Sequence, residues 1–153
     1  MTNFLINKLS ENIINKFTVG ILIKNPSCVL KELVENSLDA LSLDIQIHIE
    51  NFGYNLIKVI DNGIGIYKDD LSKVGLRFNT SKISKFSDLN NIKTYGFRGE
   101  SLFFIKCYSK LNIISKPYDQ SFAYKISFIE NEDNFKLSVN PGFNGTIVEV
   151  KDL

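Results

Sequence analysis

The stretch "DIQIHIENFGYNLIKVIDNGIG", residues 44–65, predicts the element on which the rest of the fold is built. Isoleucines at its second, fourth and sixth positions alternate with polar residues, which is the pattern of a strand with one buried face. The segment FGYN is typical of a turn, and LIKVI is a second apolar strand. We therefore expect the two strands to pair as an antiparallel hairpin.

A helix is predicted immediately before this hairpin, from Ser27 to about Leu41. Pro26 precedes it, and proline is favoured at the start of a helix. At helical spacing, the apolar residues fall on one wide face that can pack against a sheet. The residues of this face are Val29, Leu30, Leu33, Val34, Leu38 and Leu41.

The remainder of the chain mixes regular and irregular segments. A short helix is expected near residues 68–74, whereas residues 77–100 carry few helix or strand signals, and such long irregular stretches are usually functional or mobile. A buried helix, SLFFIKCY, begins near Glu100 or Ser101, and four strands follow it. We expect an α+β fold, a two-layer sandwich with helices on one face of a mixed, mostly antiparallel sheet.

The composition is that of an ordinary globular domain, which we expect to cover residues 1–153. Hydrophobic residues make up 44% of the chain and charged residues 23%, and the net charge of +1 indicates no strong overall attraction to nucleic acid or membrane. Cys28 and Cys107 are isolated in apolar surroundings, which favours a reducing, intracellular setting over a disulfide or zinc site. We predict neither a signal peptide nor a membrane span.

Glu32 and Asn36 lie one helical turn apart, beside the apolar face of the predicted helix. With Asp39 and Ala40 they form a stripe along the edge of that face. A carboxylate beside an amide, half-shielded from water, can orient a water molecule and hold the ligand sphere of a metal ion. The alternative is a solvated helix flank, and the helix alone favours that alternative.

The segment DNGIG, Asp61 to Gly65, follows the second strand directly. Gly63 and Gly65 permit backbone conformations closed to other residues and allow the backbone to come close to a ligand. The alternative interpretation of this segment is a tight turn between two strands. The patterns of a dinucleotide-binding fingerprint and of a P-loop are absent.

Three further segments have both a functional and an ordinary interpretation. GFRGESL, residues 96–102, is a glycine-bracketed loop that enters a helix, where free backbone N–H groups attract phosphate. TSK, residues 80–82, offers two hydroxyls and an ammonium, although the segment alone favours an exposed turn or a helix cap. NGT, residues 144–146, is most simply a hairpin turn. Each of these motifs is weak by itself.

The order of the motifs resembles the nucleotide site of the ATPase superfamily of gyrases, ninety-kilodalton heat-shock chaperones, histidine kinases and MutL. KELVENSLDA, DNGIGI, TSK, YGFRGES and GTIVEV are specifically similar to the N-terminal ATPase domain of MutL mismatch-repair proteins. The match covers about Phe17 to Leu153. DDLSKVGLRFNTSK is similar to the third eukaryotic branch, a subunit of the MutLγ heterodimer, whereas TYGFRGES also fits the Pms branches. The resemblance implies the Bergerat fold of the GHKL ATPases.

The resemblance also implies a role for each matching residue. Glu32 would be the general base that positions the attacking water, and Asn36 would ligate Mg²⁺, which bridges the phosphate oxygens of ATP. Asp61 would accept a hydrogen bond from the adenine amino group. The other residues of the base site would be Ala40, Gly63, Gly65 and Thr146.

Two segments, an ATP lid and a γ-phosphate loop, would form the phosphate side of the site. The ATP lid would contain Thr80, Ser81 and Lys82. In the γ-phosphate loop, backbone N–H groups would donate to the phosphates, and the carboxylate of Glu100 would be structural, because it would repel them. This loop would comprise Gly96, Phe97, Arg98, Gly99, Glu100, Ser101 and Leu102.

The chain departs from the family pattern at several points. Leu41 and Ser42 follow the first helix where the family often has Gly-Ala, so we expect the end of that helix to be lengthened or distorted. Ser101 stands where alanine is common. The family continues beyond Leu153 into a second lobe, which carries a lysine that reaches the γ-phosphate, and into a dimerisation region. We therefore expect slow hydrolysis by this chain alone.

The implied function is Mg²⁺-dependent binding and hydrolysis of ATP, which switches a MutL-type dimer in DNA mismatch repair. The implied partners are a second MutL-homologue subunit, a MutS-type mismatch recognition complex and, through the full-length dimer, DNA, but no membrane. The setting would be the nucleus in a eukaryote or the cytoplasm in a bacterium. The alternatives are a non-hydrolysing ATP-binding or interaction module, and another ATPase of the superfamily.

Overall fold

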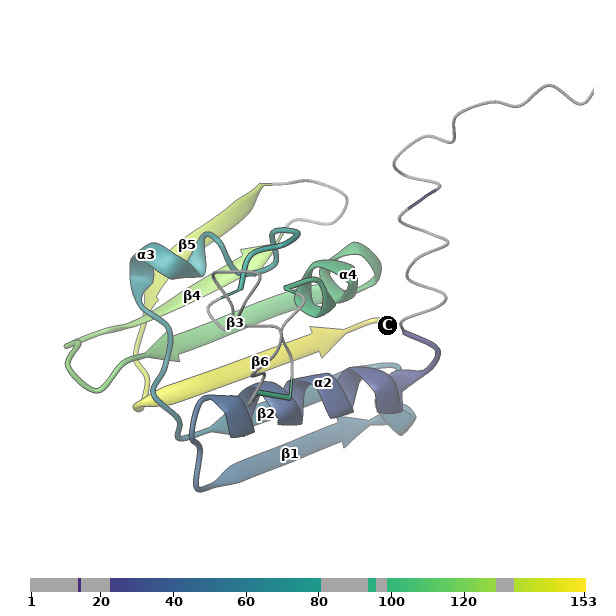
Figure 1. The fold of residues 1–153 in the computed structure, drawn as a ribbon, viewed down its shortest axis with the longest axis horizontal. Coiled ribbons are helices and arrows are strands. Elements are labelled where there is room, and N and C mark those ends of the chain that lie inside the picture. The colour runs from purple at the N-terminus through teal and green to yellow at the C-terminus, as the bar shows by residue number, and fades with distance from the viewer. Residues whose placement is uncertain (1–13, 15–22, 81–93, 96–98, 129–133) are drawn as a thin grey trace, which may run out of the picture.

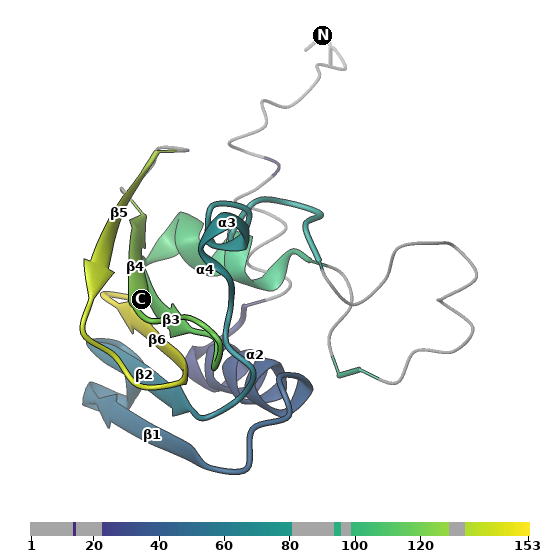
Figure 2. The same ribbon diagram turned by 90° about the vertical axis from the view of Figure 1, so that its left-hand side faces the viewer.

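The computed structural model describes residues 14, 23–80, 94–95, 99–128 and 134–153. Within these described residues, three helices lie on one face of a six-stranded sheet, as Figures 1 and 2 show, and the predicted α+β sandwich is confirmed. The helices are α2 (Pro26–Asp39), α3 (Lys68–Leu71) and α4 (Ser101–Tyr108), with a short 3-10 turn, η1 (Asn51–Gly53). The strands are β1 (Ile45–Glu50), β2 (Leu56–Asp61), β3 (Lys110–Lys116), β4 (Ala123–Phe128), β5 (Phe135–Asn140) and β6 (Gly145–Lys151).

The strand order is β1-β2-β6-β3-β4-β5, and all five pairings among the described residues are antiparallel. The sheet is thus antiparallel throughout this part of the chain, without the parallel component that a mixed sheet would have. The predicted hairpin is present as β1 and β2, with η1 at its turn. β6 inserts between β2 and β3, so the last strand of the chain lies beside the first hairpin (Figure 1).

The core forms between the helices and alternate residues of the central strands. Cross-strand pairing places Ile57, Val150 and Leu111 in one row across β2, β6 and β3. Burying one side chain of this size contributes about 1.5–3 kcal/mol. The next row along the sheet is Val59, Val148 and Ile113, and the helices add Val29, Leu33 and Ile105 to the same cluster.

Helix α2 starts as predicted but presents a different face at its C-terminal end. Asn25 caps its N-terminus, because the Asn25 side chain accepts a hydrogen bond from the Cys28 N–H at 3.0 Å. Leu38 and Leu41, both assigned to the apolar face, are 41% and 75% exposed. Ser37 is buried instead. The apolar stripe therefore ends about one turn earlier than the sequence pattern indicated.

The helix is neither lengthened nor distorted at the position where the family has glycine, so that expectation was wrong. Helix α2 ends at Asp39, and Leu41 adopts the left-handed conformation with φ of 60°. The Ser42 N–H donates to the Ser37 carbonyl at 3.1 Å and the Leu41 N–H to the Leu38 carbonyl at 2.9 Å. These two bonds form a Schellman motif, in which a leucine takes the place usually held by glycine.

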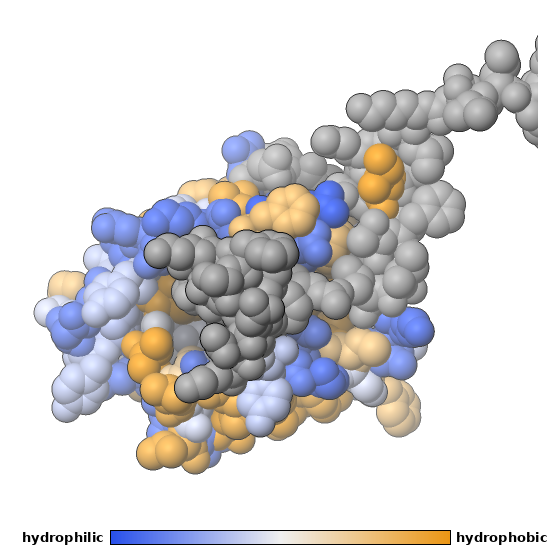
Figure 3. All heavy atoms as spheres, in the orientation of Figure 1, coloured by the Kyte–Doolittle hydropathy of each residue, from blue (hydrophilic) through white to orange (hydrophobic). Residues whose placement is uncertain are grey.

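Strand β1 lies at the edge of the sheet and is incompletely covered, because α2 packs against β2. Figure 3 shows apolar surface along the lower edge of this view, over β1 and the C-terminal end of α2. The exposed apolar residues there are Leu38, Leu41, Leu43, Ile47 and Ile49. In the described part of the chain, no helix is long and apolar enough to cross a membrane.

Replacing Leu41 by glycine tests the account of the helix end. A residue with a β-carbon in the left-handed conformation costs about 1 kcal/mol, and the exposed Leu41 side chain loses little burial on removal. Glycine also adds conformational entropy to the unfolded chain, so we expect Leu41→Gly to raise the free energy of unfolding in urea denaturation by less than the full steric cost, up to about 1 kcal/mol.

The matched control is Leu43→Gly. Leu43 is 95% exposed, and its φ is not positive. Glycine there gives no steric relief and adds conformational entropy to the unfolded chain, so it should lower the stability slightly or leave it unchanged. Equal effects of the two substitutions would contradict a strained left-handed Leu41.

Candidate functional site

Three buried polar residues lie side by side where the apolar rows of the sheet end. Asp61, Thr146 and Ser115 pair across β2, β6 and β3 and face the helices, and they are 4%, 6% and 1% exposed. Buried polar groups are costly unless they are hydrogen-bonded. This polar row, Asp61–Thr146–Ser115, is therefore a place where a ligand can be recognised by directional bonds away from water.

The Asp61 carboxylate is fixed through both of its oxygens. The Ser37 hydroxyl donates to Oδ2 at 3.0 Å, and the Gly63 N–H donates to Oδ1 at 2.9 Å. Burial raises the pKa of the Asp61 carboxyl above its usual value, and the bonds from Gly63, Ser37 and the Thr146 backbone only partly oppose this effect. Ser37, which the sequence analysis missed, could have been found from its position one turn after buried Leu33.

Gly63 and Gly65 are required by close packing of the backbone. A β-carbon at Gly63 would lie 2.6 Å from the Ala40 carbonyl oxygen, and one at Gly65 would lie 2.6 Å from the Lys116 carbonyl oxygen. Gly65 also has a φ of +74°. The segment that follows Asp61 is thus held between the end of α2 and the end of β3. Ala40, Gly63 and Gly65 are brought together with Asp61, as expected for one site.

Asn62 supports this segment from the outside, and sequence reasoning missed its role. Its side-chain oxygen accepts hydrogen bonds from the Ser42 hydroxyl at 2.8 Å and from the Leu43 and Asp44 N–H groups, both at 2.9 Å. These bonds tie the loop between α2 and β1 to the end of β2. An asparagine directly after a strand is a signal for such a turn.

Glu32 lies against the first turn of α4. The Ser101 hydroxyl donates to Glu32 Oε2 at 2.6 Å, which joins α2 to the start of α4. Asn36 follows one turn along α2 and is half-buried. Glu32 and Asn36 therefore line the same side of the sheet as the polar row, and the solvated-flank alternative for the stripe does not describe Glu32.

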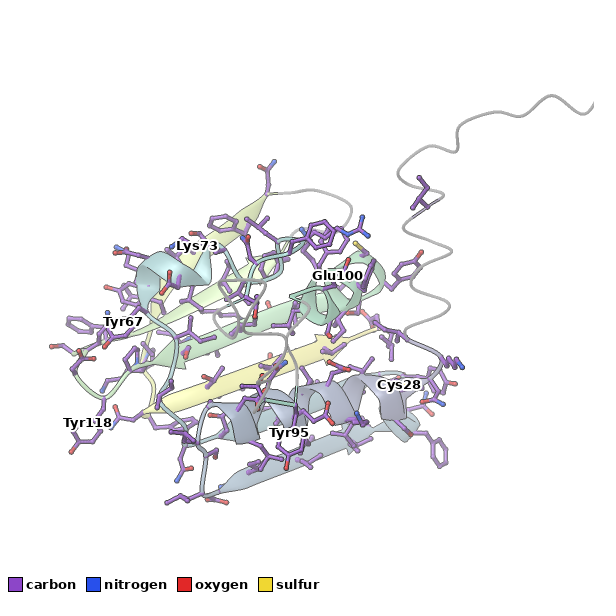
Figure 4. The ribbon with its side chains drawn as sticks, in the orientation of Figure 1. Cys28, Tyr67, Lys73, Tyr95, Glu100 and Tyr118 are labelled. Atoms are coloured by element: carbon purple, nitrogen blue, oxygen red, sulfur yellow. The ribbon has the colours of Figure 1, made fainter. Side chains whose placement is uncertain are left out.

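Gly99 and Glu100, directly before α4, are also tightly held. Gly99 has a φ of +63°, and a β-carbon there would lie 2.6 Å from the Asn79 carbonyl oxygen. The Gly99 carbonyl accepts from the Phe78 N–H at 3.0 Å. Glu100, labelled in Figure 4, pairs with Arg77 at 2.9 Å, which fits the structural role expected of it.

Part of the predicted phosphate site lies in segments with few described residues. The Tyr95 N–H donates to Asp39 Oδ1 at 3.0 Å, and Figure 4 shows Tyr95 over α2. Thr80 is described and half-buried, and Leu102 packs against the core. The other predicted residues of the lid and the γ-phosphate loop fall outside the described residues. These are Ser81, Lys82, Gly96, Phe97 and Arg98.

No group of three or more His, Cys, Asp or Glu side chains that could hold a metal ion occurs among the described residues. Asn36 offers an amide oxygen beside Glu32. Mg²⁺ commonly takes one or two protein ligands and completes its shell with water and substrate phosphates. The donor set therefore suits a magnesium ion that arrives with a nucleotide, and not a metal ion caged by protein alone.

Comparison with known proteins gives one family and one group of relatives. The profile of the histidine kinase-, DNA gyrase B- and HSP90-like ATPase family matches residues 24–143. DNA mismatch repair protein MutL of Clostridium beijerinckii is 45% identical over 97% of this chain, and DNA mismatch repair protein Mlh1 of Dictyostelium discoideum is 38% identical over 97%. The chain spans 22% and 18% of these two relatives, about a fifth of their length.

Solved structures of similar proteins share the fold. The crystal structure of the N-terminal domain of a DNA repair protein has a TM-score of 0.75 at 31% identity, covering 95% of this chain and 42% of that chain. The MutL ATPase domain of Aquifex aeolicus complexed with ADP has a TM-score of 0.62 at 31% identity, covering 86% of this chain and 43% of that chain. The Bergerat fold that the motifs implied is thereby confirmed.

Proposed function

We propose, since the chain belongs to the histidine kinase-, DNA gyrase B- and HSP90-like ATPase family and is similar to MutL, that it binds ATP at the polar row. The observation that carries this proposal is the buried Asp61 carboxylate, which is held at 2.9 and 3.0 Å by Gly63 and Ser37. A carboxylate has about four acceptor positions, so these bonds leave capacity for a donor from a ligand. The amino group of adenine is such a donor.

The phosphates would lie between α2 and the start of α4. Backbone N–H groups of residues 99–102 precede or open α4, where the helix dipole favours negative charge. Asn36 would hold Mg²⁺ through its amide oxygen, and the ion, when bound, would neutralise charge on the phosphate oxygens. The placement of Asn36 one turn from Glu32 supports this arrangement.

Glu32 would orient the attacking water. Phosphoryl transfer depends mainly on positioning and on charge stabilisation, so the carboxylate needs a fixed direction more than an unusual basicity. The Ser101 hydroxyl engages Oε2 of Glu32 at 2.6 Å, which restrains the carboxylate, and among the described residues no hydrogen bond engages Oε1, which can accept one from water. The runner-up function, an ATP-binding module without hydrolysis, differs only in that Glu32 would then have no catalytic role.

The proposed setting of this activity is a MutL-type dimer in DNA mismatch repair. The chain spans about a fifth of the mismatch repair proteins it resembles, so the dimer, a second MutL-homologue subunit, a MutS-type complex and DNA belong to the proposal for the larger protein. A nuclear location in a eukaryote follows from the same proposal.

Asp61→Asn should weaken ATP binding while it stabilises the fold. Asparagine keeps an oxygen for the Gly63 N–H but loses the charge-assisted acceptor for adenine, so we expect the Kd for ATP to rise about ten- to a hundredfold. The measurement is isothermal titration with Mg·ATP. Asp69→Asn, which removes one negative charge at an exposed position, is the control and should bind ATP as the unchanged chain does.

The stability effect of Asp61→Asn has a defined pH dependence. Because the pKa of Asp61 is raised in the folded protein, the folded state binds more protons than the unfolded state between the usual and the raised pKa. The contribution of the Asp61 carboxyl to the free energy of unfolding is therefore lost as the pH rises through its raised pKa. Asparagine, which does not ionise, avoids that loss. The variant should gain stability at neutral pH, and the gain should shrink at acidic pH.

Unchanged ATP affinity of Asp61→Asn would remove Asp61 from the base site.

Glu32→Gln tests catalysis separately from binding. Removing a general base costs about a hundredfold or more in rate, while the glutamine amide still fits beside Ser101. We expect the Kd for ATP to remain within about twofold and the turnover rate to fall at least a hundredfold, with turnover measured in a chain that extends through the second lobe implied by the resemblance. Glu35→Gln on the same helix, which breaks the pair with Lys31, should leave both quantities unchanged. Equal turnover by the extended chain with and without Glu32→Gln would support the non-hydrolysing module.

A further inference from the structure

We propose that Ser115 is a positioning residue that sets the hydrogen-bonding direction of the Thr146 hydroxyl and thereby the preference of the site for adenine. This inference rests on the proposed nucleotide binding and names a specificity determinant within it. Ser115 lies at the third position of the polar row, on β3, and is 1% exposed. No motif pointed to it, because a serine at a strand end has many ordinary explanations.

Ser115 joins three segments through one hydroxyl. Its oxygen accepts from the Ile66 N–H at 2.8 Å, lies 3.1 Å from the Gly145 carbonyl oxygen and lies 2.9 Å from Thr146 Oγ1. Ile66 belongs to the segment that follows Asp61, whereas Gly145 and Thr146 open β6. Figure 4 marks this end of the sheet by Tyr67, next to Ile66, and by Tyr118, in the turn after β3.

The number of hydroxyl hydrogen atoms decides which group donates and which accepts in each of these three contacts. A serine hydroxyl has one hydrogen and two acceptor positions, and the Ile66 N–H occupies one of those positions. A carbonyl can only accept, so the contact with Gly145 is a hydrogen bond only if Ser115 donates to it. Thr146 must then donate to the second acceptor position of Ser115. This arrangement satisfies all three contacts, and the reverse direction leaves the Gly145 contact without a hydrogen.

The direction of the Thr146 hydroxyl determines what the site accepts. With its hydrogen directed to Ser115, Thr146 presents only lone pairs to a ligand, beside the acceptor oxygens of Asp61. Two neighbouring acceptors suit an exocyclic amino group or a water molecule that donates to both. Adenine carries an amino group at its six-position, where guanine carries a carbonyl oxygen that both acceptors would repel. Ser115 therefore enforces discrimination between the two bases without touching either.

The geometry of β6 leaves little freedom for the network to rearrange. Gly145 has a φ of +121°, and a β-carbon there would collide with the Asp61 carbonyl oxygen. The backbones of Asp61 and Gly145 are thus packed against each other, which holds Thr146 at a fixed height beside Ser115. Backbone atoms fix both ends of this hydrogen-bond network. Loss of the Ser115 hydroxyl therefore leaves the Thr146 hydroxyl free to rotate.

Ser115→Ala is the direct test, and Ser109→Ala is its matched control. Ser109 is also a buried serine, 7% exposed, but within the described part of the chain its hydroxyl donates to the Ile105 carbonyl at 2.7 Å and contacts no polar group of the polar row. The Kd values for ATP and for GTP are measured by titration of the chain, together with thermal unfolding. We expect Ser115→Ala to weaken ATP binding about tenfold with less effect on GTP, so that the preference for ATP falls by a similar factor. Ser109→Ala should lose stability without changing either affinity.

Ser115→Cys keeps the result decisive if the alanine variant fails to fold. A thiol fills nearly the same volume but is a weak donor and acceptor, so it should lower the ATP preference as alanine does. Retention of the full ATP-to-GTP preference by the folded variant would overturn the inference while leaving ATP binding intact. Failure of the unchanged chain to bind either nucleotide would instead overturn the proposed function, and the inference with it.

Discussion

A carboxylate held away from water at the end of β2 is the constraint on which the rest of the site depends. Asp61 is buried at a cost that hydrogen bonds from Ser37 and Gly63 offset only in part, and its raised pKa records the remainder. Its neighbours follow from this placement. Gly63 has to be glycine because Ala40 lies against it, and Gly145 has to be glycine because its backbone packs on Asp61 itself. A polar group kept in so unfavourable a place is typical of a site that gives up stability for binding.

Local periodicity predicted most of the helices and strands. It could not predict which strands pair across long distances in the sequence. The alternation in residues 45–50, the helical spacing from Pro26 and the apolar body of α4 each depend on neighbours in sequence, so the hairpin and both long helices matched their predictions within a few residues. The insertion of β6 between β2 and β3 could not be predicted in this way, because residues 145–151 join the hairpin across most of the chain. The exposure of Leu41 was mispredicted because a Schellman motif ended the helix without a glycine.

The residues of the site likewise differ in whether the sequence alone could predict them. Asp61, Gly63 and Gly65 are close in sequence, and the motif alone indicated that they act together. The place of Ser115 in the site depends on the register of three strands, because β6 lies between β2 and β3 and so puts Ser115 in one row with Asp61. A usable signal was nevertheless present: in β2, β3 and β6 the inward positions are apolar until the one at the same sheet end, where aspartate, serine and threonine replace them. Such a break in alternation marks a polar row before any register is known.

The buried Asp61 carboxylate is proposed to recognise a base through the amino group of that base, and a carbon-detected NMR titration of the Asp61 carboxyl can measure this contact. In the free chain, the Asp61 resonance should titrate above the usual range for aspartate, because burial disfavours the charged form. Adding ATP should lower its pKa, since an amino group that donates to the carboxylate favours ionisation, whereas GTP should not lower it. An Asp61 pKa in the usual range that ignores both nucleotides would contradict the account.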